Sequence, residues 1–137
     1  MPWYAFIHPV LALATFGYGI RTAQVSSSKL REWNFPLRKQ RTRSTVFFLL
    51  CVGNMAFGFL AKLLMRGQGM EYSISAHVPL AIATIVFALA ASLVTFGRPK
   101  QPGELPPTMR AHPALLVIAG VLILTMGMLW VLKLFKV

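Results

Sequence analysis

Four long apolar stretches, separated by polar connections, dominate the pattern of this chain. They run over about 3–20, 44–65, 75–97 and 112–132. A helix needs roughly 20 mainly apolar residues to cross a bilayer, and each stretch comes close to that length. Four such runs in one short chain favour membrane spans over the core of a soluble domain. The pattern therefore predicts an all-α integral membrane protein, a single domain over 1–137 folded as a bundle of four transmembrane helices.

The connections between these stretches are unequal. Residues 21–43 form a long, polar and basic connection, and residues 98–110 contain Pro99, Pro102, Pro106 and Pro107. Proline lacks the N–H that a helix interior needs, so residues 98–110 are not expected to form a helix and should connect the helices as a stiff, partly extended segment.

Composition supports a membrane protein and orients it. Apolar residues make up 56% of the chain and charged residues 12%, with 14 Lys plus Arg, 3 Asp plus Glu and a net charge of +11. Disordered basic proteins are far less apolar, and the same apolar content argues against a nucleic-acid partner. Ten of the 14 cations fall in 21–43 and 98–110, and four lie on the other side. The positive-inside rule therefore predicts that both long connections are cytoplasmic, or stromal, and that both termini lie outside.

Residues able to carry chemistry are scarce. There is no Asp, and the acids are Glu32, Glu71 and Glu104, so paired-carboxylate catalysis lacks its residues. The single cysteine, Cys51, excludes an internal disulfide or a cysteine-rich metal site and is expected to be a buried packing residue. Whether the protein is an enzyme stays open. Within the spans, the amide of Asn54 is expected to hydrogen-bond across helices. Close helix contact is expected at four small residues, Gly53, Gly58, Gly120 and Gly127.

An internal repeat singles out two of the three histidines. The segments starting at His8 and His77 both read H-x-x-L-A-x-A-T and are separated by 69 residues. Gly58 and Gly127 share that separation. This predicts a helical hairpin that occurs twice, related by a pseudo-twofold axis along the membrane normal. His8 and His77 then lie at equal depth and face each other, whereas His112 opens the fourth stretch on the cytoplasmic side.

An ionisable side chain within a span is a functional hypothesis by default. Two facing imidazoles are natural axial ligands for haem iron, which then has no open position and transfers electrons. The predicted metal ligands are His8 and His77, and the predicted cofactor-binding residues are His8, His77 and His112, with haem b as the cofactor. Other interpretations stay open. Each histidine can simply hydrogen-bond within the bundle, one can ligate the magnesium of a chlorophyll, and one can bond a quinone carbonyl.

The three histidines and the number of helices carry a family resemblance. The chain resembles small four-helix membrane haem proteins of the cytochrome b561-like kind. It is also similar to an uncharacterised four-helix family of photosynthetic bacteria and plastids whose helices start with His-Pro. The resemblance implies electron transport, and a place in a bacterial inner membrane or a thylakoid. Cytochrome b561 holds two haems with four histidines, whereas this chain has 3 and has room for one bis-histidine haem.

A second function fits the same features. A small chain with little soluble part is typical of an accessory subunit, which packs in a larger photosynthetic or respiratory complex and contacts pigment, quinone or lipid. The expected partners are therefore the lipid bilayer and either a larger redox or photosynthetic complex or further copies of the chain.

Overall fold

The computed structural model describes residues 6–30, 35–69, 76–102 and 104–134 of the protein. In this part of the chain the structure is all-helical, with no strand, as predicted. There are four long helices: α1 (Ile7–Lys29), α2 (Leu37–Gly67), α3 (His77–Leu93) and α4 (His112–Leu134). Two short 3-10 turns flank the last connection, η2 (Val94–Phe96) and η3 (Pro107–Arg110).

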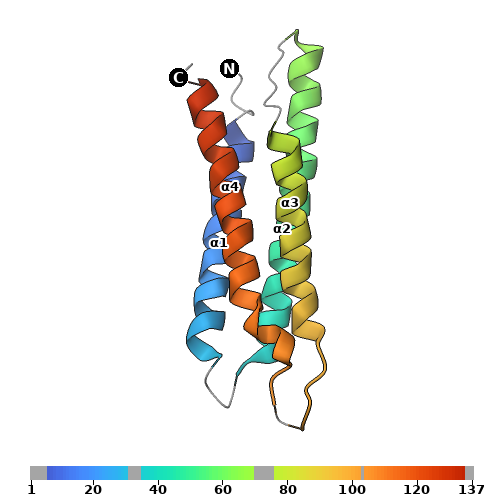
Figure 1. The fold of residues 1–137 in the computed structure, drawn as a ribbon. Helices are drawn as coiled ribbons and strands as arrows, with labels where there is room; N and C mark the ends of the chain where they lie inside the picture. The colour runs from blue at the N-terminus through green and yellow to red at the C-terminus, as the bar shows by residue number, and fades with distance from the viewer. Residues whose placement is uncertain (1–5, 31–34, 70–75, 103, 135–137) are drawn as a thin grey trace.

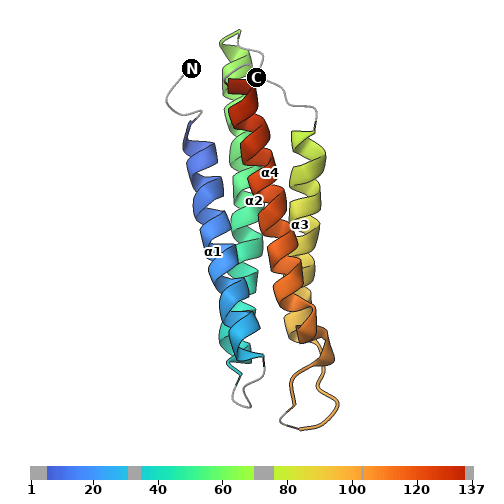
Figure 2. The same cartoon turned by 60° about the vertical axis from the view of Figure 1, so that its left-hand side comes forward.

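The helices run up and down in one elongated bundle (Figures 1 and 2). Helix α1 packs against α2 and α4, and α3 also packs against α2 and α4. These four packed pairs close a ring, which sets α1 and α3 diagonally opposite each other. We call the end at which α1 begins and α4 finishes the terminal end (Figure 1). The other end, where α1 leads to α2 and α3 leads to α4, is the basic end.

The centre of the bundle is packed with small and apolar side chains. Phe47, Ala88 and Leu116 have no exposed surface, and Cys51 is 5% exposed, as predicted for a packing residue. Gly19 on α1 allows the close approach of α2, because a Cβ there would lie 2.5 Å from Cε2 of Phe47. Tight apolar packing therefore fills the middle of the bundle between its two ends.

The outer surface is also apolar. Exposed fractions reach 61% for Leu13, 64% for Phe59, 57% for Val86 and 66% for Met128, one residue from each helix. A soluble monomer rarely exposes apolar surface over so much of its perimeter. Such a surface suits the hydrocarbon of a bilayer, where interiors and exteriors of helix bundles are similarly apolar.

Within the described ranges, three helices are long and apolar enough to cross a membrane: α2, the run His77–Phe96 made by α3 and η2, and α4 as far as Lys133. Helix α1 is not among them, since its second half carries Arg21 and Gln24. The first predicted span, 3–20, begins outside the described residues.

The basic connection predicted over 21–43 is mostly helical, which corrects the sequence interpretation. Residues 21–29 complete α1 and residues 37–43 begin α2. A helix satisfies its own backbone hydrogen bonds, so polar residues with fair helix propensity extend it beyond its apolar part. The connection over 98–110 is partly extended, as predicted: ψ is 134° at Pro106, whereas the N–H of Glu104 donates to the carbonyl oxygen of Gln101 and the 3-10 turn η3 follows from Pro107.

Candidate functional site

The structure brings together His8 and His77, the two histidines of the repeat. They lie in the first turns of α1 and α3, so they meet across the bundle diagonal near the terminal end. Their ring centroids are 5.9 Å apart, with an angle of 64° between the ring planes. The predicted meeting of these two side chains is therefore present in the fold, and His112 lies at the opposite end.

The imidazole of His8 is held against α2. A Cβ at Gly58 would lie 2.8 Å from Cε1 and 3.0 Å from Nε2 of this ring, so only a glycine leaves room for it without a shift. The backbone of Asn54, one turn before Gly58 on α2, also lies beside this ring. The position of the ring is thus set by α2 as well as by its own helix.

One nitrogen of each imidazole is left without a partner. Nδ1 of His8 and Nδ1 of His77 are buried and have no hydrogen bond to any described residue. The side-chain oxygen of Asn54 is likewise buried and has no hydrogen bond to any described residue. Leaving a buried polar atom unpaired costs about 1–3 kcal/mol, and such atoms in native structures call for a water, an ion or a function. The cluster at the terminal end is therefore a candidate ligand site.

Asn54 connects this site to α1, as the sequence predicts for a polar residue deep in a span. Its Nδ2 donates to Oγ1 of Thr15 over 2.6 Å and to the carbonyl oxygen of Leu11 over 3.3 Å. These bonds join α1 to α2 just inside the histidine pair. They hold the two helices that position His8 in one register.

A pair of equivalent threonines in the repeat shows similar burial and the same backbone hydrogen bond. Thr15 and Thr84, each seven residues after its histidine, are both 3% exposed. Each donates its hydroxyl over 2.8 Å to the carbonyl oxygen four residues earlier. The sequence similarity of the repeat therefore extends to the burial of these two side chains.

The glycines follow the expectation only in part. Gly58 contacts His8, and a Cβ at Gly120 would lie 3.3–3.4 Å from side chains of α1. A Cβ at Gly53 or Gly127 would meet nothing within 4 Å, so the prediction that these two permit close helix contact is wrong. The surface at both positions is open instead of being packed against a neighbouring helix.

His112 forms a separate polar cluster at the basic end, where it is completely buried. Its Nδ1 lies 2.8 Å from Oγ of Ser26 on α1, and its Nε2 lies 2.5 Å from Oγ of Ser44 on α2. Ser44 donates its one proton to the carbonyl oxygen of Gln40, so it must accept from His112. The imidazole is therefore protonated on Nε2, and Ser26 donates to Nδ1. Three helices are joined by one chain of hydrogen bonds.

Sequence reasoning missed both serines of this cluster. A signal was present, because Ser26 follows His8, Thr15 and Thr22 at helical spacing on one face of α1, and these polar residues all turn inward. Ser26 was hidden by its location in the connection predicted over 21–43, whereas Ser44 lies at the first position of the second predicted span and was not recognised there. Among the described residues, no three of His, Cys, Asp and Glu lie close enough to hold a metal ion.

No protein-family model, no curated protein and no solved structure matches this chain. Its function is therefore inferred from the geometry of the two histidine clusters and from the surface of the bundle.

Proposed function

We propose that the protein is a membrane b-type cytochrome that transfers electrons through one haem, with His8 and His77 as its two axial ligands. The observation that carries this proposal is the pair of imidazoles on diagonal helices, 5.9 Å apart, each with a buried Nδ1 that has no partner among the described residues. His112 is not one of the proposed ligands, because both of its nitrogens are already bonded to serines.

The separation of the rings supports a shared metal ion. Two imidazoles on opposite sides of one ion have centroids about 6 Å apart, because each metal–nitrogen bond is about 2 Å long and each ring adds its own radius. A metal ion bound by both rings would give a partner to each unpaired Nδ1.

The number of protein ligands favours haem over a bare ion. A structural zinc ion takes four protein ligands, and no described group offers even three. A porphyrin brings four nitrogens of its own, so two histidines complete the six positions of its iron. Haem with two histidine ligands supplies one-electron transfer without an open position for oxygen. The residues present therefore fit this group.

The remaining roles fall to side chains around the pair. Gly58 leaves space for the ring of His8, and Asn54 and Thr15 hold α1 and α2 in register beside it. Lys62 is exposed about one helical turn beyond Gly58, at the terminal end of α2. It offers a cation near the surface where the acidic side chains of a porphyrin would emerge. The role of the chain itself is to orient the two histidine ligands and to exclude water from them.

The membrane placement is part of the same proposal. All four helices cross the bilayer, including α1, and the basic end faces the cytoplasm or stroma of a bacterial inner membrane or a thylakoid. Labelling of single introduced cysteines in intact cells tests this placement. The native Cys51 is buried, so the labelling reports on the introduced cysteine. Lys100→Cys is expected to react only after the membrane is opened, whereas Arg66→Cys is expected to react while the cells are still intact. Labelling of both from one side would contradict the placement.

The spectrum of the purified protein tests the haem. In the reduced-minus-oxidised difference spectrum, the wild type is expected to show a b-type α-band that is lost in His8→Ala and in His77→Ala. Ser28→Ala, which changes an exposed residue at the other end, is the control and keeps the band. A folded but colourless protein that copurifies with a larger complex would reject the proposal and favour the accessory subunit. A chlorophyll spectrum would assign a single histidine to magnesium.

A further inference from the structure

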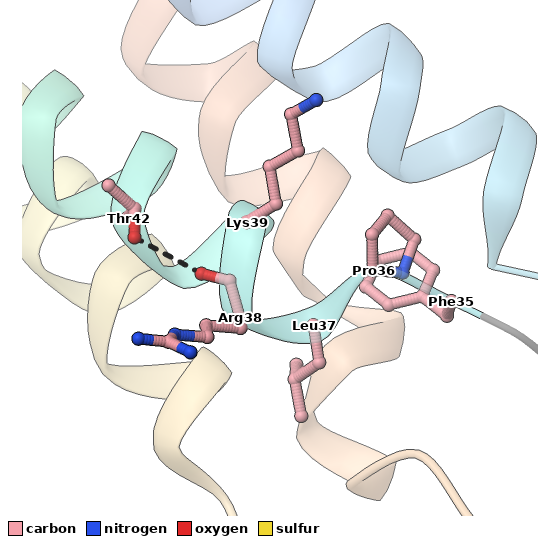
Figure 3. Close-up of a pocket in the computed structure, with 6 residues that line it drawn as sticks. All are labelled: Phe35, Pro36, Leu37, Arg38, Lys39 and Thr42. Atoms are coloured by element: carbon pink, nitrogen blue, oxygen red, sulfur yellow. Dashed lines mark hydrogen bonds between the residues drawn. The ribbon is translucent and has the colours of Figure 1, made fainter.

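A hollow of about 660 Å³ lies at the start of α2, at the basic end. Figure 3 shows its lining, with Arg38 and Lys39 reaching out from the first turn of the helix and Pro36 and Phe35 beside it. Leu37 and Thr42 complete the lining. The hollow therefore combines two cations and a hydroxyl group with a set of apolar side chains.

The two cations of the hollow are exposed, in contrast to their neighbour Arg41. Nη2 of Arg41 donates over 3.0 Å to the carbonyl oxygen of Thr95, and its guanidinium lies 4.3 Å from the ring centroid of Phe96. The charge of Arg41 thus serves the packing of α2 against η2. Arg38 and Lys39 project from the bundle toward its surroundings instead.

The surrounding charge is of one sign. The first turn of α2 contains no acidic residue, and its first residue follows a proline that makes no side-chain cap. Glu104 is the one acid described at the basic end, against many Lys and Arg of 21–43 and 98–110. A basic surface attracts anionic lipids by about 1 kcal/mol for each Lys or Arg near it.

We propose that this hollow binds the headgroup of an anionic phospholipid from the leaflet at the basic end. The phosphate binds the guanidinium of Arg38, whose donors suit phosphate oxygens, and Lys39, which leaves the helix in another direction (Figure 3), adds its charge to the attraction. The glycerol and the first part of the acyl chains lie against Phe35 and Leu37. This inference rests on the membrane placement proposed above and is independent of the haem.

Native mass spectrometry of the full-length protein in detergent tests the site, with phosphatidylglycerol and phosphatidylcholine of the same acyl chains as probes. The test variant is Arg38→Gln/Lys39→Gln. The matched control is Arg98→Gln/Lys100→Gln, which removes the same charge from exposed residues at the same end but outside the hollow. Circular dichroism checks that all samples keep their helices, and the haem spectrum of each sample is recorded separately.

The wild type is expected to retain phosphatidylglycerol in preference to phosphatidylcholine. The test variant is expected to lose between about fivefold and 25-fold of that affinity, since each cation contributes about fivefold. The control is expected to lose less than the test variant, because its two cations attract the lipid only through the surface charge and do not contact the bound headgroup. Equal losses in both double variants would show a diffuse surface attraction and overturn the site, as would no loss in either.

A competition experiment distinguishes a lipid phosphate from a free phosphate compound as the bound anion. Glycerol phosphate at millimolar concentration is expected to leave the bound lipid in place, because it lacks acyl chains to pack on Phe35 and Leu37. Displacement by glycerol phosphate would reassign the hollow to a free phosphate compound and overturn the lipid proposal. A colourless protein with the expected lipid preference would reject the haem alone.

Discussion

The cluster around His112 yields a sharp prediction about stability. His112→Ala removes the imidazole that joins Ser26 on α1 to Ser44 on α2, and all three side chains are completely buried. After the substitution Ser44 keeps its bond to the carbonyl oxygen of Gln40, whereas Ser26 loses its acceptor. The variant is therefore expected to fold into the same bundle with a lower free energy of unfolding.

The size of the loss follows from two contributions. Truncating a large buried side chain to Ala costs about 2–5 kcal/mol through lost contacts and the cavity left behind. Side-chain hydrogen bonds inside membrane proteins contribute about 0.6 kcal/mol on average and at most about 1.7 kcal/mol. Two such bonds and a cavity at the low end of the range predict a loss of about 3 kcal/mol.

Denaturant titration in mixed micelles measures this loss, and a double-mutant cycle isolates the hydrogen bond. Ser26→Ala and His112→Ala are expected to be coupled by about 0.6–1.7 kcal/mol. Ser28→Ala is the matched control, because Ser28 is exposed and only bonds to the carbonyl oxygen of Val25; it is expected to change stability by less than about 0.5 kcal/mol. A His112→Ala protein as stable as the wild type, or a coupling of zero, would refute the network.

Two further predictions concern the terminal end. Gly58→Ala places a methyl group 2.8 Å from the ring of His8, below the optimum contact distance of about 3.5 Å. This variant is expected to lower haem affinity by at least about tenfold in a haem titration. Gly53→Ala, on an open part of the same helix, is expected to leave haem affinity unchanged. Asn54→Ala removes the bond to Thr15 and is expected to lower the free energy of unfolding by about 0.6–1.7 kcal/mol in the same micelle titration, and no loss would show that this bond does not join the helices.

Much of the architecture follows from local patterns. The apolar stretches predicted the helices, and the prolines of 98–110 predicted an extended crossing. The repeat placed His8 opposite His77 because parallel copies of a hairpin put equivalent residues at equal depth. Asn54 was predicted to bond across helices for lack of water as an alternative partner.

Other features depend on packing that a pattern does not contain. The polar segments that extend α1 and α2 resemble loops in hydropathy, so the helix ends and Ser26, one of the partners of His112, were missed together. Gly53 and Gly127 look like Gly58 in sequence, yet only Gly58 faces a neighbouring ring, because the direction of each face is set by the whole bundle. The hollow at the start of α2 likewise depends on where Pro36 turns the chain.

The oxidised protein offers the most direct test of a haem between two histidines. Protein expressed with ample haem is purified, its haem is extracted and counted per chain, and its electron paramagnetic resonance spectrum is recorded. One haem b per chain with a low-spin, six-coordinate ferric signal is the expected result, because His8 and His77 fill both axial positions. A folded protein without haem, or a high-spin signal with an open axial position, would contradict the assignment of these two residues.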